Sequence, residues 1–312
     1  MPHARRFLAF AVPVLLLALA WLLFGAWARQ LEARALCPDW PECYRQVAVA
    51  VAADPAPPTA VGIARDIADG ALALGLAGLA GFGWQRRLRP IDRRWLLPLV
   101  AFALVGSAAA ARVMELGALW QWCAGMTVCA LLWWVALRER RFWRPVTESA
   151  ATRALRPRVL TGLGLASVAA ALGGWAMVSG IGLPCPEYPA CRGEWWPGNL
   201  FAAFTAPGRP DLATAMALEM SHRLAAAVSL IYVTWLGLHV WRIGGRDRLC
   251  RYGMLVLAAL LTAAGIGIMG AVTRLPLTTA VAHSAAAAGL LLSLVTLYHV
   301  VRPVARPEKR NA

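Results

Sequence analysis

The chain has 312 residues, of which 60% are hydrophobic, and its 15 tryptophans and mean hydropathy of +0.58 exclude an ordinary soluble domain. Its formal net charge is +15, yet nearly all the arginines lie in short segments between apolar runs, and no basic segment carries the signature of a known nucleic-acid-binding fold. The composition therefore indicates a membrane protein with several spans and excludes nucleic acid as a partner.

Eight apolar runs are each long enough to cross a lipid bilayer as a helix of about 20 residues. In chain order they cover roughly 7–27, 62–84, 95–113, 116–137, 158–181, 212–241, 252–272 and 277–301. The first run lacks a small-residue cleavage site, so we expect a permanent helix rather than a removed signal peptide. The sequence thus predicts an all-α integral membrane protein with eight transmembrane helices.

The arginines alternate between connections, which predicts an orientation. They gather before the first run, in every second connection and after the last run. Because positively charged loops stay in the cytoplasm, we expect both termini on the cytoplasmic side of a bacterial inner membrane. The loops 28–61 and 182–211 would then be periplasmic.

A cysteine motif occurs twice and divides the chain into halves. Cys37-Pro-Asp-Trp-Pro-Glu-Cys43 returns as Cys185-Pro-Glu-Tyr-Pro-Ala-Cys191, 148 positions later (185 − 37), and a Trp-Ala pair precedes each copy at the same distance. We therefore expect two pseudo-symmetric four-helix bundles. They would comprise an N-terminal repeat over 1–145 and a C-terminal repeat over 158–312, joined by a cytoplasmic linker over 146–157.

The cysteines of each motif are spaced for a small ring bent by prolines. Both pairs lie on the side expected to be oxidising, which predicts the disulfides Cys37–Cys43 and Cys185–Cys191. A metal site is the weaker alternative, because neither loop contains a histidine to complete four ligands.

Two of the histidines lie at matching depth in the predicted bundle. His222 follows Asp211 by 11 residues and His283 follows Arg274 by nine, which puts both rings about 15 Å below the outer ends of their helices. An ionisable side chain is expensive to place in a bilayer, so such a residue is a functional candidate. A level imidazole pair in a helical bundle suits a low-spin haem iron, and a hydrogen-bonded interior pair without iron is the alternative.

The other two intramembrane histidines are out of phase with this pair. His239 follows His222 by 17 residues and His299 follows His283 by 16. At about 100° per residue, neither lies on the same face of its helix as the earlier histidine. Both neighbour residues typical of a membrane interface, Trp241 and Arg302. We therefore expect them to be interfacial anchors rather than ligands of a second haem.

The segment Glu219-Met-Ser-His222-Arg223, the paired Cys-Pro-x-Trp/Tyr-Pro-x-Cys loops and the doubled four-helix pattern resemble the heme A synthase family over nearly the whole chain. The resemblance implies an oxidoreductase that converts a methyl group of haem O to a formyl group, in haem A biogenesis for cytochrome oxidase. It also implies one haem b per chain, held in the C-terminal half by His222 and His283. Arg223 and Arg274 become candidates to pair with the haem propionates.

The resemblance further implies haem O in the N-terminal half, and haem O synthase and oxidase-assembly proteins as partners. The family pattern has two more histidines in that half, but this chain has none between positions 4 and 221. Counting nine residues from Arg112, as from Arg274 to His283, reaches Gln121.

The second helix departs from the family in the same way. The best register sets Asp66-Ile-Ala-Asp69 against Glu219-Met-Ser-His222, so that Asp69 stands where the family has a histidine. Asp66 becomes the candidate acid or base in place of the family glutamate. The alternative is that both carboxylates cap a helix start at the wet surface.

Three functions stay open at this point. The first is an oxidoreductase of the heme A synthase type. The second is a haem b-binding carrier or oxidase-assembly protein that has kept the cofactor half and lost the substrate half. The third is a periplasmic thiol–disulfide electron conduit that uses the two cysteine pairs.

Overall fold

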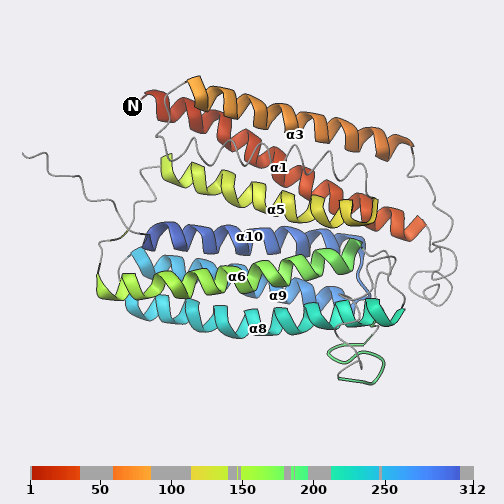
Figure 1. Ribbon diagram of the computed structural model, residues 1–312. Coiled ribbons are helices and arrows are strands. Elements are labelled where there is room, and N and C mark those ends of the chain that lie inside the picture. Colours follow the sequence, from red (N-terminus) through yellow and green to blue (C-terminus); the bar gives the residue numbers. More distant parts are fainter. Residues whose placement is uncertain are drawn as a thin grey trace, which may run out of the picture.

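The computed structural model describes residues 2–35, 59–85, 114–139, 146, 149–178, 184–185, 187–195, 212–245 and 248–302. These residues form an all-helical fold of roughly aligned rods (Figure 1). The helices are α1 (Pro2–Ala35), α3 (Thr59–Gln85), α5 (Met114–Glu139), α6 (Ala150–Val178), α8 (Leu212–Gly244), α9 (Arg248–Val272) and α10 (Leu277–Val301). Each coincides with one of the predicted spans, whereas the span predicted over 95–113 lies outside the described residues.

Helix α6 begins earlier than the sequence predicted, inside the segment assigned to a linker. It starts at Ala150 rather than near 158 because Ser149 caps it: the Thr152 amide donates to Ser149 Oγ at 3.1 Å and the Ser149 amide donates to Thr152 Oγ1 at 2.8 Å. The Arg156 guanidinium then donates to the Val301 carbonyl at 2.8 Å, which ties the second turn of α6 to the end of α10.

The C-terminal helices form a closed four-helix bundle. Helix α8 packs between α6 and α9, and α10 completes the ring by packing on both α9 and α6. Helices α8 and α10 therefore face each other across the interior of this bundle (Figure 1).

The described N-terminal helices pack onto this bundle in a layer. Helix α1 contacts both α3 and α5, and the α1–α5 pair lies against α10, with α5 also touching α6. One continuous apolar core runs through both parts. Because the span predicted over 95–113 lies outside the described residues, two matching four-helix bundles remain a prediction.

The outer surface of the helices is that of a membrane protein. Five described helices are long and apolar enough to cross a bilayer, over Ala9–Ala28, Ala150–Met177, Ala213–Gly244, Arg248–Val272 and Leu277–Val301. Large apolar side chains on them face outward, with Ile231 73% and Val272 64% exposed. Such an apolar band needs lipid around it, so the chain is a multi-pass membrane protein.

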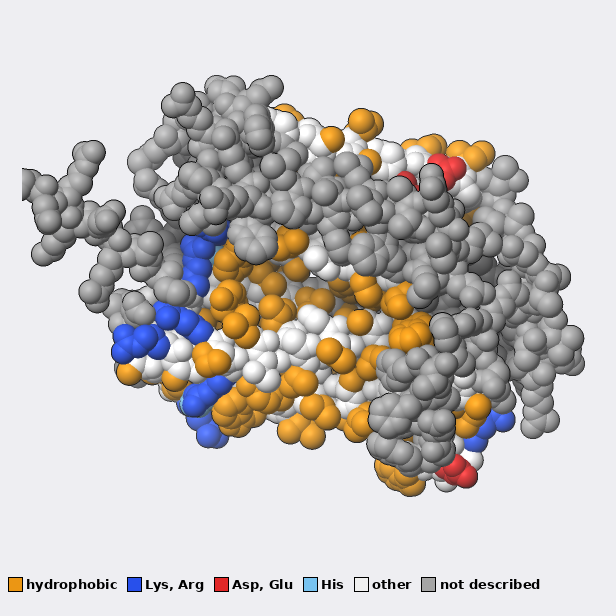
Figure 2. Space-filling model, viewed as in Figure 1, with side chains coloured by type: hydrophobic (Ala, Val, Ile, Leu, Met, Phe, Trp, Pro, Cys, Tyr) orange, Lys and Arg blue, Asp and Glu red, His pale blue; other side chains and the backbone are white. Residues whose placement is uncertain are grey.

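The charged side chains gather at the two ends of the helices. Figure 2 shows Lys and Arg side chains at the end where α6 begins and α8 ends, with the apolar band between the two ends. The cysteine loop of the C-terminal half lies at the opposite end (Figure 1). This separation agrees with the alternation in the sequence, and the assignment of the arginine-rich end to the cytoplasm remains a prediction.

Candidate functional site

The two histidines that the sequence placed at one depth meet in the interior of the C-terminal bundle. His222 comes from α8 and His283 from α10, the two helices that face each other across it. Their ring centres are 6.4 Å apart and the ring planes are inclined at 75°. The structure therefore brings together the pair that depth alone predicted.

Each imidazole is oriented by a backbone carbonyl of the preceding helix. Nδ1 of His222 lies 2.9 Å from the Ala169 carbonyl oxygen on α6, and Nδ1 of His283 lies 3.1 Å from the Ala263 carbonyl oxygen on α9. A carbonyl only accepts hydrogen bonds, so Nδ1–H is the donor in both contacts. This leaves the Nε2 lone pair of each neutral ring for a metal, the arrangement expected of histidine ligands.

A glycine one helical turn after each carbonyl makes room for the ring. A Cβ atom added at Gly173 would lie 2.7 Å from Cε1 of His222, and one added at Gly267 would lie 2.7 Å from Cε1 of His283. Residues i and i+4 are neighbours on a helix surface, so the carbonyl and the glycine together form a notch for the imidazole. Any other residue would push the ring out of it.

The pair fits a haem iron by distance and by number of ligands. An imidazole nitrogen lies about 2.0 Å from a first-row metal ion, so ring centres 6.4 Å apart are close enough for both rings to bind one metal ion. No group of three or more His, Cys, Asp or Glu residues suited to a bare metal ion occurs among the described residues. Two protein ligands are enough only for a metal that brings its own equatorial nitrogens, as haem iron does.

Comparison with known proteins gives the family. The family model COX15-CtaA, described as cytochrome oxidase assembly protein, matches residues 74–295. A heme A synthase of Shewanella oneidensis is 28% identical over 315 aligned positions, which cover 91% of this chain and 93% of that protein. The chain belongs to the heme A synthase family. A heme A synthase of Rhodospirillum centenum is 30% identical over 167 positions, which cover 53% of this chain and 44% of that protein.

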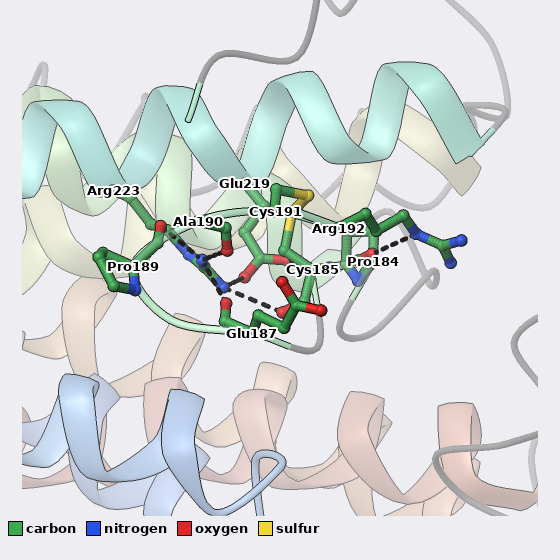
Figure 3. Close-up of polar contacts among 9 residues, drawn as sticks. All are labelled: Pro184, Cys185, Glu187, Pro189, Ala190, Cys191, Arg192, Glu219 and Arg223. Carbon is green, nitrogen blue, oxygen red and sulfur yellow. Dashed lines mark hydrogen bonds and ion pairs between the residues drawn. A yellow bond between two sulfur atoms is a disulfide. The ribbon is translucent and has the colours of Figure 1, made fainter. Parts of the chain in front are cut away.

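The outer loop of this heme A synthase family member is folded around Arg223 (Figure 3). The guanidinium donates to the carbonyl oxygens of Cys185, Glu187, Pro189 and Ala190 at 2.8–3.1 Å. It also pairs with the Glu219 carboxylate one turn earlier on α8, at 2.5 Å. Arg223 thus fixes the loop above the histidine pair, and its predicted role at a haem propionate stays a prediction.

Glu219 links the same loop to the helix that carries His222. Its side chain is buried, and Oε2 accepts a hydrogen bond from the Cys185 amide at 3.3 Å while Oε1 receives the Arg223 guanidinium. A buried carboxylate with both oxygens bonded is held in one position. The Glu-x-x-His-Arg segment therefore joins loop, ion pair and histidine on one stripe of α8.

The predicted Cys185–Cys191 disulfide is confirmed, and both residues are fully buried beneath the loop. Exchange with a thiol requires direct attack on a disulfide sulfur, so burial argues against this pair as an electron conduit. The other predicted pair, Cys37 and Cys43, lies outside the described residues.

We expect no free thiol at Cys185 or Cys191 in protein isolated in air. Alkylation under denaturing conditions without reductant, followed by mass spectrometry, should leave both unlabelled, whereas prior reduction should label both. Cys250, which is a free thiol in the structure, is the internal control for alkylation. Labelling of the pair by an impermeant maleimide in unreduced cells would contradict both the bridge and its burial.

The remaining candidates are dispersed. Arg274 lies on the turn between α9 and α10, with an exposed side chain and a left-handed backbone (φ 61°), at the same end as the loop. His239 stacks on Trp235 with ring centres 5.4 Å apart and accepts a hydrogen bond from Arg158 at 2.6 Å, as an interfacial residue can. His299 differs from our expectation: it is 1% exposed and contacts Trp134 of α5 edge-on, because α5 covers this part of α10.

Two of the N-terminal candidates, Asp66 and Asp69, lie on α3, away from the histidine pair. Asp66 lies exposed on α3, and Asp69 accepts a hydrogen bond from the indole N–H of Trp21 on α1. Gln121 lies on α5, but its side chain is outside the described residues. Asp66 as an acid or base therefore remains a prediction.

Sequence reasoning missed the residues that support the ligands. Gly173 and Gly267 each follow a small residue, Ala169 or Ala263, at a spacing of four. Trp122 of α5 uses the next such notch along α6: its indole N–H donates to the Ala170 carbonyl at 3.1 Å, and its ring lies against Gly174. A four-residue spacing is common in membrane helices, so only the partner ring identifies a notch as a binding feature.

Proposed function

We propose that this chain is a membrane oxidoreductase of haem A biosynthesis. It would hold one haem b between His222 and His283 and oxidise a methyl group of haem O to a formyl group. The site would lie in a bacterial inner membrane with the Cys185–Cys191 loop in the periplasm. Haem O synthase and oxidase-assembly proteins would be its partners, as suppliers of substrate and recipients of product.

The observation that carries this proposal is the oriented histidine pair. The two ring centres are 6.4 Å apart, and each Nδ1–H is bound to a backbone carbonyl, which leaves Nε2 of both rings as the candidate iron ligand. When bound there, haem b would supply one-electron redox chemistry at its iron. The apolar helices around the pair would keep water from the iron, and the hydrogen bonds to the Ala169 and Ala263 carbonyls hold the two rings in place.

A second candidate function is favoured by one observation in the N-terminal half. Asp69, at the position of a family histidine, is bound to Trp21 instead of facing an open space. This favours a haem b protein that assists oxidase assembly without oxidising haem O. The two candidates share the cofactor site and differ only in whether a second haem is processed.

If the chain oxidises haem O, we expect haem A to appear in the membranes of a host that makes haem O once the chain is produced there. The measurement is chromatography of extracted haems with and without the chain, with His222→Ala produced at equal level as the matched control. A haem A peak that depends on His222 supports the oxidoreductase. Haem b bound to the purified chain without any haem A supports the second candidate and overturns the first.

A further inference from the structure

Trp21 lies in the interior of the N-terminal half and bridges two helices. Its indole N–H donates to the Asp69 carboxylate on α3, and the side chain is 9% exposed. The far edge of the ring lies against α5, where a Cβ added at Gly125 would be 2.9 Å from Cζ3 of Trp21. The ring therefore fills the space between α3 and α5.

By the internal repeat, Trp21 and Asp69 occupy the positions that correspond to Ala169 and His222 at the proposed haem site. Position 169 on α6 corresponds to position 21 on α1, through the offset of 148 positions between the cysteine motifs (169 − 148). The helix register sets Asp69 against His222. Ala169 touches His222 in one half and Trp21 touches Asp69 in the other, so corresponding positions meet in both halves.

The two halves differ in what fills the space between these positions. In the C-terminal half, position 169 is an alanine that offers only its carbonyl, and the ring of His222 is free to face His283. In the N-terminal half, position 21 is a tryptophan whose ring extends toward Gly125, four residues after Gln121. Gln121 is the residue that corresponds to His283, so the indole lies between the two helices that carry the former ligand positions.

We propose that Trp21, held by Asp69, occupies in the N-terminal half the place that haem b takes in the C-terminal half, so that the chain carries one haem only. This inference rests on the proposed haem b site. It leaves no room for haem O between α3 and α5, so it favours the second candidate function over the oxidation of haem O. Tryptophan is the largest side chain, and a close-packed interior leaves no room for a porphyrin beside it. Trp21 and Asp69 thus determine how many haems this member of the family binds.

The inference predicts that ligands alone cannot restore a second haem site. The double variant Asp69→His with Gln121→His should keep about one haem per chain. Adding Trp21→Ala should raise the ratio to about two, because the indole no longer fills the space between α3 and α5. The matched control is Trp27→Ala in the same double variant, which removes a tryptophan from α1 that contacts Phe24 instead. Haem is counted as the pyridine haemochrome against protein by amino-acid analysis.

The outcomes separate this inference from the proposed cofactor site. A wild-type ratio of two, falling to one in His222→Ala, would overturn the inference and leave the haem b site intact. A double variant that gains haem while Trp21 is present would overturn it as well. A wild-type ratio of zero would instead refute the haem b site and the inference that rests on it.

A second variant, Trp21→Leu, tests the inference in case Trp21→Ala fails to fold. Trp21→Leu keeps an apolar side chain in the core and creates a smaller cavity than Trp21→Ala. In the His-substituted background it should also raise the haem ratio, and the haem at His222 and His283 reports that the bundle is folded. If that haem is retained and neither Trp21 variant gains another, Trp21 does not close the site.

Discussion

Replacement of His222 or His283 by alanine is expected to reduce the haem content of the purified protein from about one per chain to nearly zero. Both rings would be needed to hold the iron, and the described bundle offers no third histidine near the pair, since His239 is bonded to Arg158 and His299 lies against Trp134. With one of the two histidines gone, the remaining one would hold the haem only weakly. The low-spin optical spectrum should disappear with either variant.

The control for this prediction is His239→Ala, which removes a membrane histidine without touching the pair. It should retain haem and spectrum, because its ring stacks on Trp235 at the far end of α8. If His239→Ala with His299→Ala removed the haem while His222→Ala kept it, the assignment of ligands would be wrong. Equal amounts of folded protein in size-exclusion chromatography keep the comparison valid.

The helices could be predicted because length and apolarity suffice for a membrane span. The level histidine pair could be predicted because helical rise converts sequence spacing into depth. The start of α6 could not, since the Ser149–Thr152 cap was hidden by the arginines and the proline that follow it. Burial of His299 was missed for a different reason: it depends on α5 packing over α10, and no pattern within α10 encodes that neighbour.

The support of the ligands was also beyond sequence reasoning. Ala169 and Gly173 show only that two small residues occur one turn apart, which any close helix crossing would explain. Their function becomes visible when the ring of His222 is found between them. The contact of Trp21 with Asp69 could not be predicted either. Aligning Asp69 with His222 shows that a histidine is absent from α3, but it does not show that Trp21 contacts the residue in its place.

Helix α5 of the N-terminal half also stabilises the bundle that contains the histidine pair. Trp122 of α5 lies in the notch of Ala170 and Gly174, adjacent on α6 to the notch that holds His222. Nearer the other end, Trp133 donates to Thr296 of α10 at 2.8 Å. Helix α5 thus packs on both α6 and α10. Helix α6 orients His222, and α10 carries His283. A half that has lost its own ligands can be retained for this packing alone.

Replacement of Gly267 by alanine is expected to weaken haem binding, although Gly267 has no side chain that could bind haem. The added Cβ would lie 2.7 Å from Cε1 and 3.1 Å from Nδ1 of His283, so the imidazole must leave its notch and lose its bond to the Ala263 carbonyl. Overpacking of this kind costs about 1–3 kcal/mol. That corresponds to a roughly five- to 150-fold loss of haem affinity.

The chain provides a matched control two residues away on the same helix. A Cβ at Gly265 would meet nothing within 4 Å, so Gly265→Ala should leave haem affinity and spectrum unchanged. The same pair of tests exists on α6, where Gly173→Ala would press on His222 and Gly164→Ala would meet nothing within 4 Å. Titration of apo-protein with haem, followed by absorbance, measures all four variants. Equal affinities for Gly267→Ala and Gly265→Ala would show that the notch does not orient His283, and the geometric case for the iron site would fall with it.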